Sequence, residues 1–148
     1  LEAAGQREAA HFAGDVPYAE VPSWHRSLDV FCALSLQESY GVAVVEAMSC
    51  GRPVVVSDAA GLVELVGGGV GGVVVPRRDP DSAAREIERL ARDPGLRARL
   101  GMQGRRHALA ELDWRTTLEH TLAVYQQLLA PKTRALRARD RRSRSDRG

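Results

Sequence analysis

The sequence is poor in cysteine, and it has no long apolar segment. Its only two cysteines among 148 residues, Cys32 and Cys50, lack the spacing of metal ligands. No apolar run approaches the roughly 20 residues that a membrane-spanning helix needs. The first ten residues carry charges and lack the apolar stretch of a secretory signal peptide. We therefore expect a cytoplasmic protein in which both cysteines are small, buried and reduced.

An excess of charge of one sign is also missing, except near the C-terminus. The formal net charge is +2, but residues 131–148 hold eight Lys or Arg against two Asp, which leaves −4 on the rest. A segment so poor in apolar residues predicts a solvated, disordered basic tail. Two alternatives are contact with anionic lipid at the inner membrane surface and, less favoured, contact with nucleic acid.

Short β-branched runs alternate with helical patterns over the first 76 residues. Apolar runs predict strands at His11–Ala13, Asp29–Ala33, Pro53–Ser57 and Gly72–Val75. Helical patterns at residues 17–28, 41–50 and 61–66 lie between these runs. Strands that are apolar throughout and separated by helices are typical of a parallel sheet covered on both faces. The pattern predicts an α/β fold with a Rossmann-like parallel sheet of about four strands.

After Asp79 the apolar period becomes helical and stays so. Asp79 is a candidate N-cap, with Pro80 in the first turn of the helix. This helix is expected to bury a stripe made of Ala84, Ile87, Leu90 and Ala91. A second helix, after the break at residues 93–95, is expected to bury Leu96, Leu100 and Met102.

A last helix is predicted from about Trp114 to Leu129. Its residues Leu118, Leu122, Tyr125 and Leu129 share one apolar face. Trp114 and Tyr125 are interpreted as core residues rather than as a stacking platform. The C-terminal region is thus expected to be entirely helical as far as the basic tail.

The segment from Ser35 to Gly51 carries the candidate chemistry. It follows a buried strand, so it lies where open α/β sheets bind ligands. Gly41 opens a helix whose first amides lack intrahelical acceptors and, with the helix dipole, suit a phosphate. Glu38 precedes this turn and Glu46 lies on the helix, about 7 Å further along its axis. Because carboxylates repel phosphate, we expect both to bind sugar or ribose hydroxyls.

Other patterns are interpreted as structural. Residues 67–72 fit G-x-G-x-x-G, but they precede a strand instead of opening a helix, so we interpret them as a turn. Glu64 is either a residue that supports the site or a solvated helix residue. The four histidines, which have no Ser, Cys or carboxylate arrangement typical of catalysis, are interpreted as surface or packing residues: His11, His25, His107 and His120.

An ordered set of motifs supports a family resemblance. The set comprises Glu38-x7-Glu46, preceded by Asp29-Val-Phe, then residues 51–58 (Gly-Arg-Pro-Val-Val-Val-Ser-Asp), 61–65 (Gly-Leu-Val-Glu-Leu) and 72–76 (Gly-Val-Val-Val-Pro). Together these motifs resemble the C-terminal, nucleotide-sugar-binding domain of family-4 retaining glycosyltransferases of GT-B fold. The similarity extends from about His11 to Leu129. It implies half of a GT-B fold, with an incomplete sheet.

The resemblance implies a role for each site residue. Glu46 would bind the ribose hydroxyls, and Glu38, the catalytic residue, would hold hydroxyls of the transferred sugar near the reacting carbon. The loop 14–16 would contact the base through the backbone of Val16. The amides at the turn would bind the distal phosphate and sugar, from Ser39, Tyr40, Gly41, Val42 and Ala43. The donor would be a UDP-, GDP- or ADP-sugar, with no cofactor and no bound metal.

Two departures from the family qualify this assignment. Leu34 stands where the family usually has Pro, which loosens the loop slightly. The family's basic pair on the diphosphate, like its acceptor-binding domain, would lie upstream of Leu1. We therefore expect residues 1–130 to form an N-terminally truncated donor-binding domain, with little transfer activity of its own and an unknown acceptor.

The expected truncation also affects the sheet. In strand order 3-2-1-4-5-6, strands 1 and 2 would be missing. Either His11–Ala13 then pairs with Asp29–Ala33, or a complementary N-terminal-domain chain or a second copy fills the gap. Alternatives for the whole chain are a non-catalytic nucleotide-sugar-binding module that pairs with a separate acceptor-binding chain, and a truncated, inactive product. A related sugar-nucleotide epimerase is disfavoured because its catalytic carboxylates have no match.

Overall fold

A computed structural model describes residues 5–145, with side chains described for residues 5–129 apart from residue 7. The chain forms two units, Leu1–Arg106 and His107–Gly148. The first unit is an α/β domain around a three-stranded parallel sheet in the order β1-β2-β3. The strands are β1 Phe31–Ala33, β2 Val54–Ser57 and β3 Gly72–Val75. These three predicted strands are confirmed, with ends within two residues of those expected.

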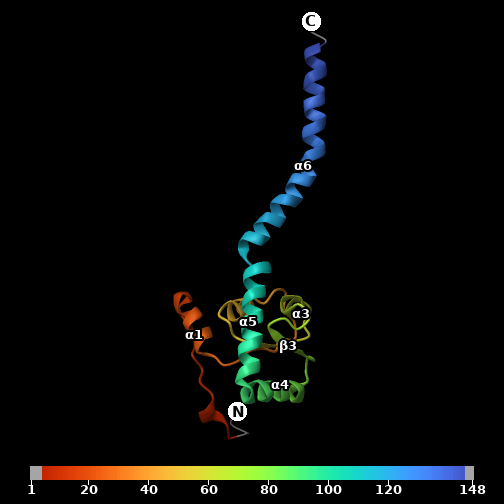
Figure 1. The fold of residues 1–148 in the computed structure, drawn as a ribbon. Coiled ribbons are helices and arrows are strands. Elements are labelled where there is room, and N and C mark those ends of the chain that lie inside the picture. Colours follow the sequence, from red (N-terminus) through yellow and green to blue (C-terminus); the bar gives the residue numbers. More distant parts are fainter. Residues whose placement is uncertain (1–4, 146–148) are drawn as a thin grey trace. The chain divides into compact units, whose positions relative to one another are not determined.

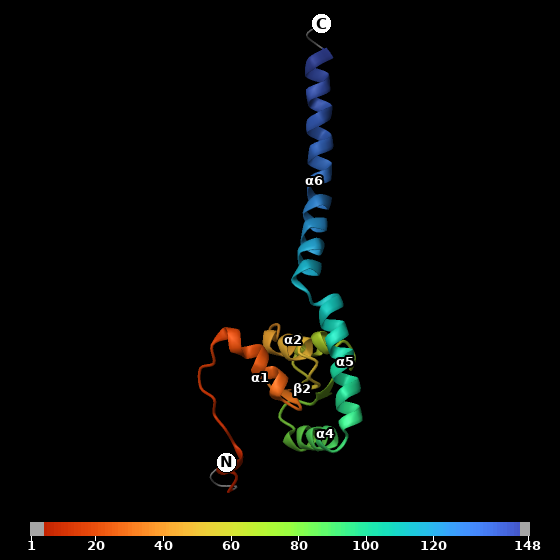
Figure 2. The same cartoon turned by 60° about the vertical axis from the view of Figure 1, so that its left-hand side comes forward.

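Helices cover both faces of this sheet (Figures 1 and 2). Helices α2 (Val42–Ser49) and α3 (Ala60–Val66) lie on one face, and α4 (Pro80–Arg92) lies on the other. Val55 packs with Val75 of β3 and with side chains of α4. Because side chains alternate along a strand, the buried Val54 and Val56 point to the face of α2 and α3. The α/β class predicted from the sequence is thereby confirmed.

The fourth strand expected at His11–Ala13 does not form. The N-terminal part instead contains η1 (Arg7–Ala9), η2 (Tyr18–Glu20) and α1 (Val21–Ser27), and the ring of His11 stacks on Trp24. Among the described residues, β1 pairs with β2 alone. The run at residues 11–13 is short and its Phe12 is 81% exposed, so it buries too little apolar surface to offset the entropy of ordering a strand.

The expected burial of both cysteines is also wrong. Cys32 is exposed because it lies on β1, the edge strand of the sheet. Cys50, at the end of α2, is half-buried, and its Sγ lies 3.8 Å from the carbonyl oxygen of Pro22 in α1. This contact is one of those that hold α1 against α2.

Helix α4 begins as predicted, and Ile87 and Leu90 of the predicted stripe face the core, but its two alanines do not. Asp79 caps the helix, accepting a 2.9 Å hydrogen bond from the Ser82 amide. Ala83 and Leu90 are buried, whereas the expected Ala84 and Ala91 are exposed. Ile87 lies between Ala83 and Leu90 on the same face, at spacings of four and three residues.

Helix α5 (Pro94–Glu111) also differs from expectation at one position. Leu96 and Leu100 pack against the core as predicted, but Met102 is 60% exposed. The neighbouring Gly101 takes the inward position, since a Cβ there would lie within 2.1 Å of the Gly51 carbonyl oxygen. The close approach of two backbones therefore turns Met102 to the surface.

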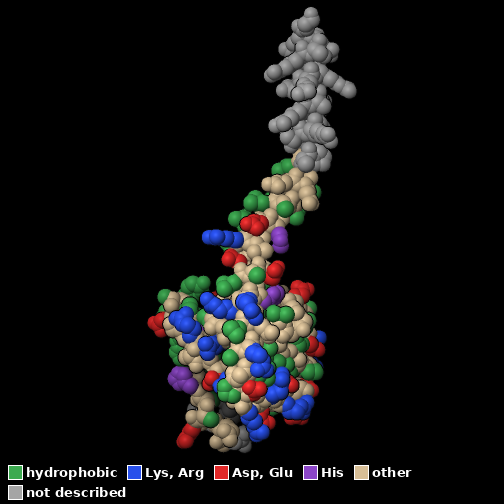
Figure 3. Space-filling view, viewed as in Figure 1, with side chains coloured by type: hydrophobic (Ala, Val, Ile, Leu, Met, Phe, Trp, Pro, Cys, Tyr) green, Lys and Arg blue, Asp and Glu red, His purple; other side chains and the backbone are tan. Residues whose placement is uncertain are grey.

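Arginine side chains are prominent on the face of the first unit that carries α5 (Figure 3). Two arginines of α5 bind the C-termini of other helices. Arg97 donates 2.7 Å hydrogen bonds to the carbonyls of Leu90 and Ala91 at the end of α4, and Arg105 donates to Ser49 at the end of α2. Cations at such positions stabilise the final carbonyls of a helix. These two arginines therefore have a structural role.

The second unit contains the end of α5 and helix α6 (Trp114–Ser145). The large apolar side chains of α6 from Trp114 to Leu129 are exposed, with Trp114 at 80% and Tyr125 at 58%, so the core role predicted for Trp114 and Tyr125 is wrong. The backbone of α6 is helical through residue 145, whereas the sequence predicted a disordered tail from residue 131. The helix is consistent with the composition of this segment, because Arg, Lys, Leu and Ala are strong helix formers. Residues 146–148 lie outside the described part. No described helix is both long and apolar enough to span a membrane.

Candidate functional site

The loop between β1 and α2 holds the predicted phosphate-binding turn. Gly41 is the N-cap of α2, with φ 91° and ψ 52°. An added Cβ would lie 2.7 Å from Leu62 and 3.0 Å from Leu65, so glycine is needed both for its backbone angles and for its small size. The first helical hydrogen bond runs from the Val44 amide to the Gly41 carbonyl at 2.9 Å. The amides of Val42 and Ala43 therefore lie at the open start of the helix.

Glu38 is bound by the loop that carries it. Its Oε1 accepts hydrogen bonds from the amides of Ser39 at 3.0 Å and Tyr40 at 3.4 Å. Helix α3 packs tightly beneath this loop, since a Cβ on Gly61 would lie 2.6 Å from the Ser39 carbonyl oxygen. Two consecutive amides thus converge on a single anionic oxygen beside the start of α2, an arrangement that binds anions in many loops.

Glu46 lies on the second turn of α2, on the side that faces α1. Its Oε2 is 3.5 Å from Nε2 of His25, and its side chain is 32% exposed. Glu38 lies at the start of the same helix, where its Cγ would be 3.6 Å from a Cβ on Gly41. The structure thus places one carboxylate beside the glycine turn and the other further along the helix, against α1.

The remaining predicted site residues are less closely gathered. Val42 and Ala43 are exposed at the first turn of α2, next to Gly41. Val16 is half-buried in the loop between η1 and η2, which leads into α1. Since α1 packs on α2, the loop of Val16 is connected to the site through η2 and α1.

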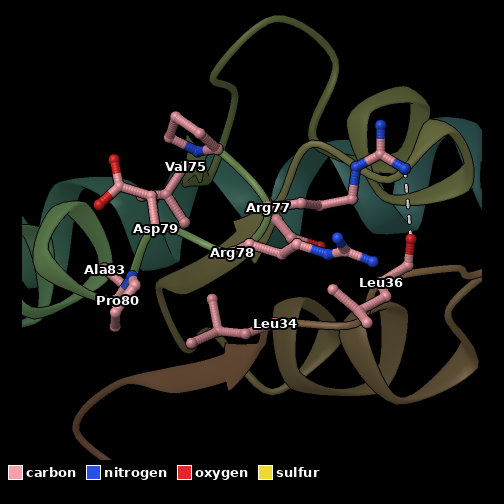
Figure 4. Close-up of a pocket in the computed structure, with 10 residues that line it drawn as sticks. Leu34, Leu36, Val75, Arg77, Arg78, Asp79, Pro80 and Ala83 are labelled. Atoms are coloured by element: carbon pink, nitrogen blue, oxygen red, sulfur yellow. Dashed lines mark hydrogen bonds between the residues drawn. The ribbon is translucent and has the colours of Figure 1, made fainter.

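Sequence reasoning missed a polar cluster at the carboxyl ends of β2 and β3. The amide and Nε of Arg77 donate to Oδ1 of Asp58 at 2.9 and 2.8 Å, and Nη1 of Arg77 donates to the Leu36 carbonyl at 3.3 Å (Figure 4). These bonds, from the backbone first and then from the side chain, hold the pKa of Asp58 below its usual value. Ser57 Oγ also donates to the Ser35 carbonyl. The cluster therefore ties the start of the Glu38 loop to the neighbouring strands.

Two hollows lie at this edge of the sheet. The smaller, of about 190 Å³, has a mainly apolar lining that includes Leu34, Leu36 and Val75 (Figure 4). The larger, of about 590 Å³, is lined by Leu36, Gln37, Asp58, Arg77 and Arg78. Neither hollow is lined by the two glutamates or by Gly41. The position of residues 76–79 directly after a predicted strand was the signal that could have identified this cluster.

Comparison with curated proteins identifies several relatives that share one name. The chain is 34% identical over 122 residues to a D-inositol 3-phosphate glycosyltransferase of Kribbella flavida, covering 82% of this chain and 28% of that protein. It is 40% identical over 111 residues to the protein of the same name from Salinispora arenicola, covering 75% of this chain and 25% of the relative. The chain thus spans about a quarter of the length of these relatives.

Solved structures show the same fold. Sucrose-phosphate synthase from Thermosynechococcus elongatus matches 88% of this chain with a TM-score of 0.81 and 28% identity, over 33% of its own length. Anabaena Alr3699/HepE, solved in complex with UDP and glucose, matches 82% of this chain with a TM-score of 0.73 and 27% identity, over 34% of its length. The first unit therefore has the α/β architecture of a part of GT-B glycosyltransferases.

A family model agrees with both comparisons. The model described as glycosyl transferases group 1 matches residues 1–107, which include all three strands and the loop from Glu38 to Glu46. The chain belongs to the group 1 glycosyl transferases.

Proposed function

We propose that this chain is the donor-binding part of a retaining, family-4-type hexosyltransferase that uses a nucleoside-diphosphate sugar. Its donor would bind at the Gly41 turn, between Glu38 and Glu46, with the base against the backbone of Val16. The solved Anabaena relative in complex with UDP and glucose supports a donor of this class. The acceptor site would belong to another domain or chain.

The observation that carries this proposal is the pair of amides on Glu38. The Ser39 and Tyr40 amides bind a carboxylate oxygen at 3.0 and 3.4 Å, so the loop is built to hold an anion. The open start of α2 adds the amides of Val42 and Ala43 and the positive end of the helix dipole. A distal phosphate would replace the Glu38 carboxylate on these amides. Glu38, once released, would accept hydrogen bonds from the sugar hydroxyls.

Glu46 has a different place in the proposed complex. It is partly exposed on α2, and its contact with His25 engages Oε2 rather than Oε1. A carboxylate in this position would accept hydrogen bonds from both ribose hydroxyls. The two glutamates would then fix the donor at its two ends, with the diphosphate on the helix start between them.

Binding of nucleotides by the purified full chain tests the proposal. Saturation-transfer NMR with UDP, GDP and ADP should show contact for at least one of them. For that nucleotide, Glu46→Gln should weaken binding by about tenfold, since a hydrogen bond to a charged group contributes about 1.5–3 kcal/mol. Glu38→Gln should weaken binding of the nucleotide sugar more than binding of the nucleoside diphosphate, because Glu38 would contact the sugar.

An exposed glutamate elsewhere provides the matched control. Glu88, on α4, pairs with Arg92 on the same helix, so Glu88→Gln should leave nucleotide affinity unchanged. Binding of none of the three nucleotides by folded protein would refute the proposal. Equal losses in Glu46→Gln and Glu88→Gln would refute the assigned site.

A further inference from the structure

His25 is a buried polar residue for which the sequence indicated no role. It lies on α1, only 7% exposed, and the edge of its ring meets Phe31 of β1 at a centroid distance of 5.4 Å. Its Nε2 faces Oε2 of Glu46 on α2 at 3.5 Å. Its Nδ1 is buried and has no hydrogen-bond partner among the residues whose side chains are described. The ring is therefore held between a strand and a carboxylate of the proposed donor site.

The surroundings of the ring determine where its proton belongs. A neutral imidazole has one N–H donor and one bare nitrogen. A proton on Nδ1 alone would leave a buried donor without an acceptor and would place the lone pair of Nε2 against a carboxylate, and both arrangements are unfavourable. A proton on Nε2 points at Glu46 and leaves only a bare Nδ1 inside. The proton therefore belongs on Nε2, which is the donor toward the Glu46 carboxylate.

We propose that His25 is a positioning residue for ribose recognition, holding Glu46 through the contact between Nε2 and Oε2 so that Oε1 faces the ribose hydroxyls. This inference rests on the proposed function, since it assigns the second partner of the residue that would bind ribose. His25 itself does not touch the donor. It fixes the partly exposed carboxylate of Glu46, and a fixed acceptor loses less entropy when the ligand binds.

A merely structural role for His25 would predict something different. If the ring only filled space between α1, α2 and Phe31, then phenylalanine would replace it without changing ligand selectivity. If its N–H positions Glu46, phenylalanine should impair discrimination between nucleotides with and without ribose hydroxyls, and glutamine should restore it. Glutamine places an amide N–H about as far from the backbone as Nε2 of histidine.

The location of the proton can be tested without any ligand. Long-range ¹H–¹⁵N NMR of the imidazole rings, with His25 assigned by comparison with His25→Phe, should show a proton on Nε2. A proton on Nδ1 alone would overturn the proposal. A proton on Nε2, with or without a second proton on Nδ1, supports it.

Ribose discrimination provides the second test on the full chain. The ratio of Kd values for the 2′,3′-dideoxy nucleotide and its ribonucleotide should fall by about fivefold in His25→Phe, since a charge-assisted hydrogen bond contributes more than tenfold when lost entirely. His25→Gln should retain the ratio within about twofold. Circular dichroism and urea unfolding of each variant verify that it folds.

The outcomes separate this inference from the proposed function. Loss of discrimination in Glu46→Gln together with full discrimination in folded His25→Phe would overturn the role of His25 and leave the donor site intact. Unchanged discrimination in both variants would overturn the assignment of Glu46 itself. If His25→Phe failed to fold, equal impairment in His25→Gln and Glu46→Gln would still overturn the donor role of Nε2–H.

Discussion

Gly61 is the position at which a single added methyl group should disturb the site most directly. A Cβ there would lie 2.6 Å from the Ser39 carbonyl oxygen and 2.7 Å from that of Glu38. Both atoms are backbone, so neither can move aside as a side-chain tip would. To reach an ordinary contact of about 3.5 Å, the loop and the start of α3 must separate by close to 1 Å. That separation would move the Ser39 and Tyr40 amides away from α2.

The energetic effect of Gly61→Ala combines two terms. Alanine is favoured over glycine within a helix by about 1 kcal/mol. Overpacking against unyielding atoms costs about 1–3 kcal/mol, and three backbone atoms within 2.8 Å place this site at the upper end. We therefore expect a net loss of about 2 kcal/mol in the free energy of unfolding, or roughly 8–16 °C in Tm for a domain of this size.

Gly95→Ala is the matched control. Gly95, like Gly61, is the second residue of a helix, but a Cβ there would meet only side-chain atoms of Asp93 and Arg99 at 3.3 and 3.6 Å. This substitution should be neutral or stabilise by up to about 1 kcal/mol. Urea unfolding of both variants measures the difference, and nucleotide titration of Gly61→Ala should show weakened binding even where the protein is folded. If the free energies of unfolding of Gly61→Ala and Gly95→Ala differed by less than about 1 kcal/mol, and Gly61→Ala bound nucleotide with unchanged affinity, the close approach of Gly61 to the Glu38 loop would be refuted.

Two further perturbations test the core and the polar cluster. Leu90→Ala should lower the free energy of unfolding by about 2–5 kcal/mol because Leu90 is fully buried, whereas the exposed Met102→Ala should change it by less than about 0.5 kcal/mol. Comparable urea midpoints for the two variants would contradict the packing described. Asp58, whose pKa is lowered from 3.8, should stabilise the fold above that pH and lose its contribution as the pH falls through the lowered value. The urea midpoint of the wild type should therefore exceed that of Asp58→Asn at pH 6, and the two midpoints should approach each other at pH 3. If the midpoints of the two proteins differed equally at both pH values, the bond between Asp58 and Arg77 would be contradicted.

Continuous β-branched runs made the sheet predictable from the sequence. Val54, Val55 and Val56 are β-branched and form a buried strand, and the run at residues 72–75 forms a strand that is buried at its two ends. The failure at His11–Ala13 has the opposite cause. Its single large apolar side chain, Phe12, is 81% exposed, and no local pattern shows whether a neighbouring strand is in reach.

Contacts between distant residues explain the remaining errors. Met102 is exposed because Gly101 touches the backbone at Gly51, fifty residues earlier, and a helical period cannot reveal such a contact. The glycine turn at residue 41 could be predicted because one of its two causes is local: a left-handed backbone at a helix start. The roles of His25 and Arg77 could not, because each depends on how separate elements dock.

The partners of the two glutamates suggest how the proposed donor site would be used. Glu38 is held by two amides of its own loop, whereas Glu46 is held by a residue of another helix. A ligand with only a ribose would engage Glu46 and leave Glu38 on its amides. A ligand with a distal phosphate would bind those amides and displace the Glu38 carboxylate. The sugar hydroxyls would replace the hydrogen bonds that Glu38 loses only if a sugar were attached to the phosphate. Phosphate and sugar would thus bind cooperatively at Glu38, since each replaces one side of the same internal hydrogen bonds.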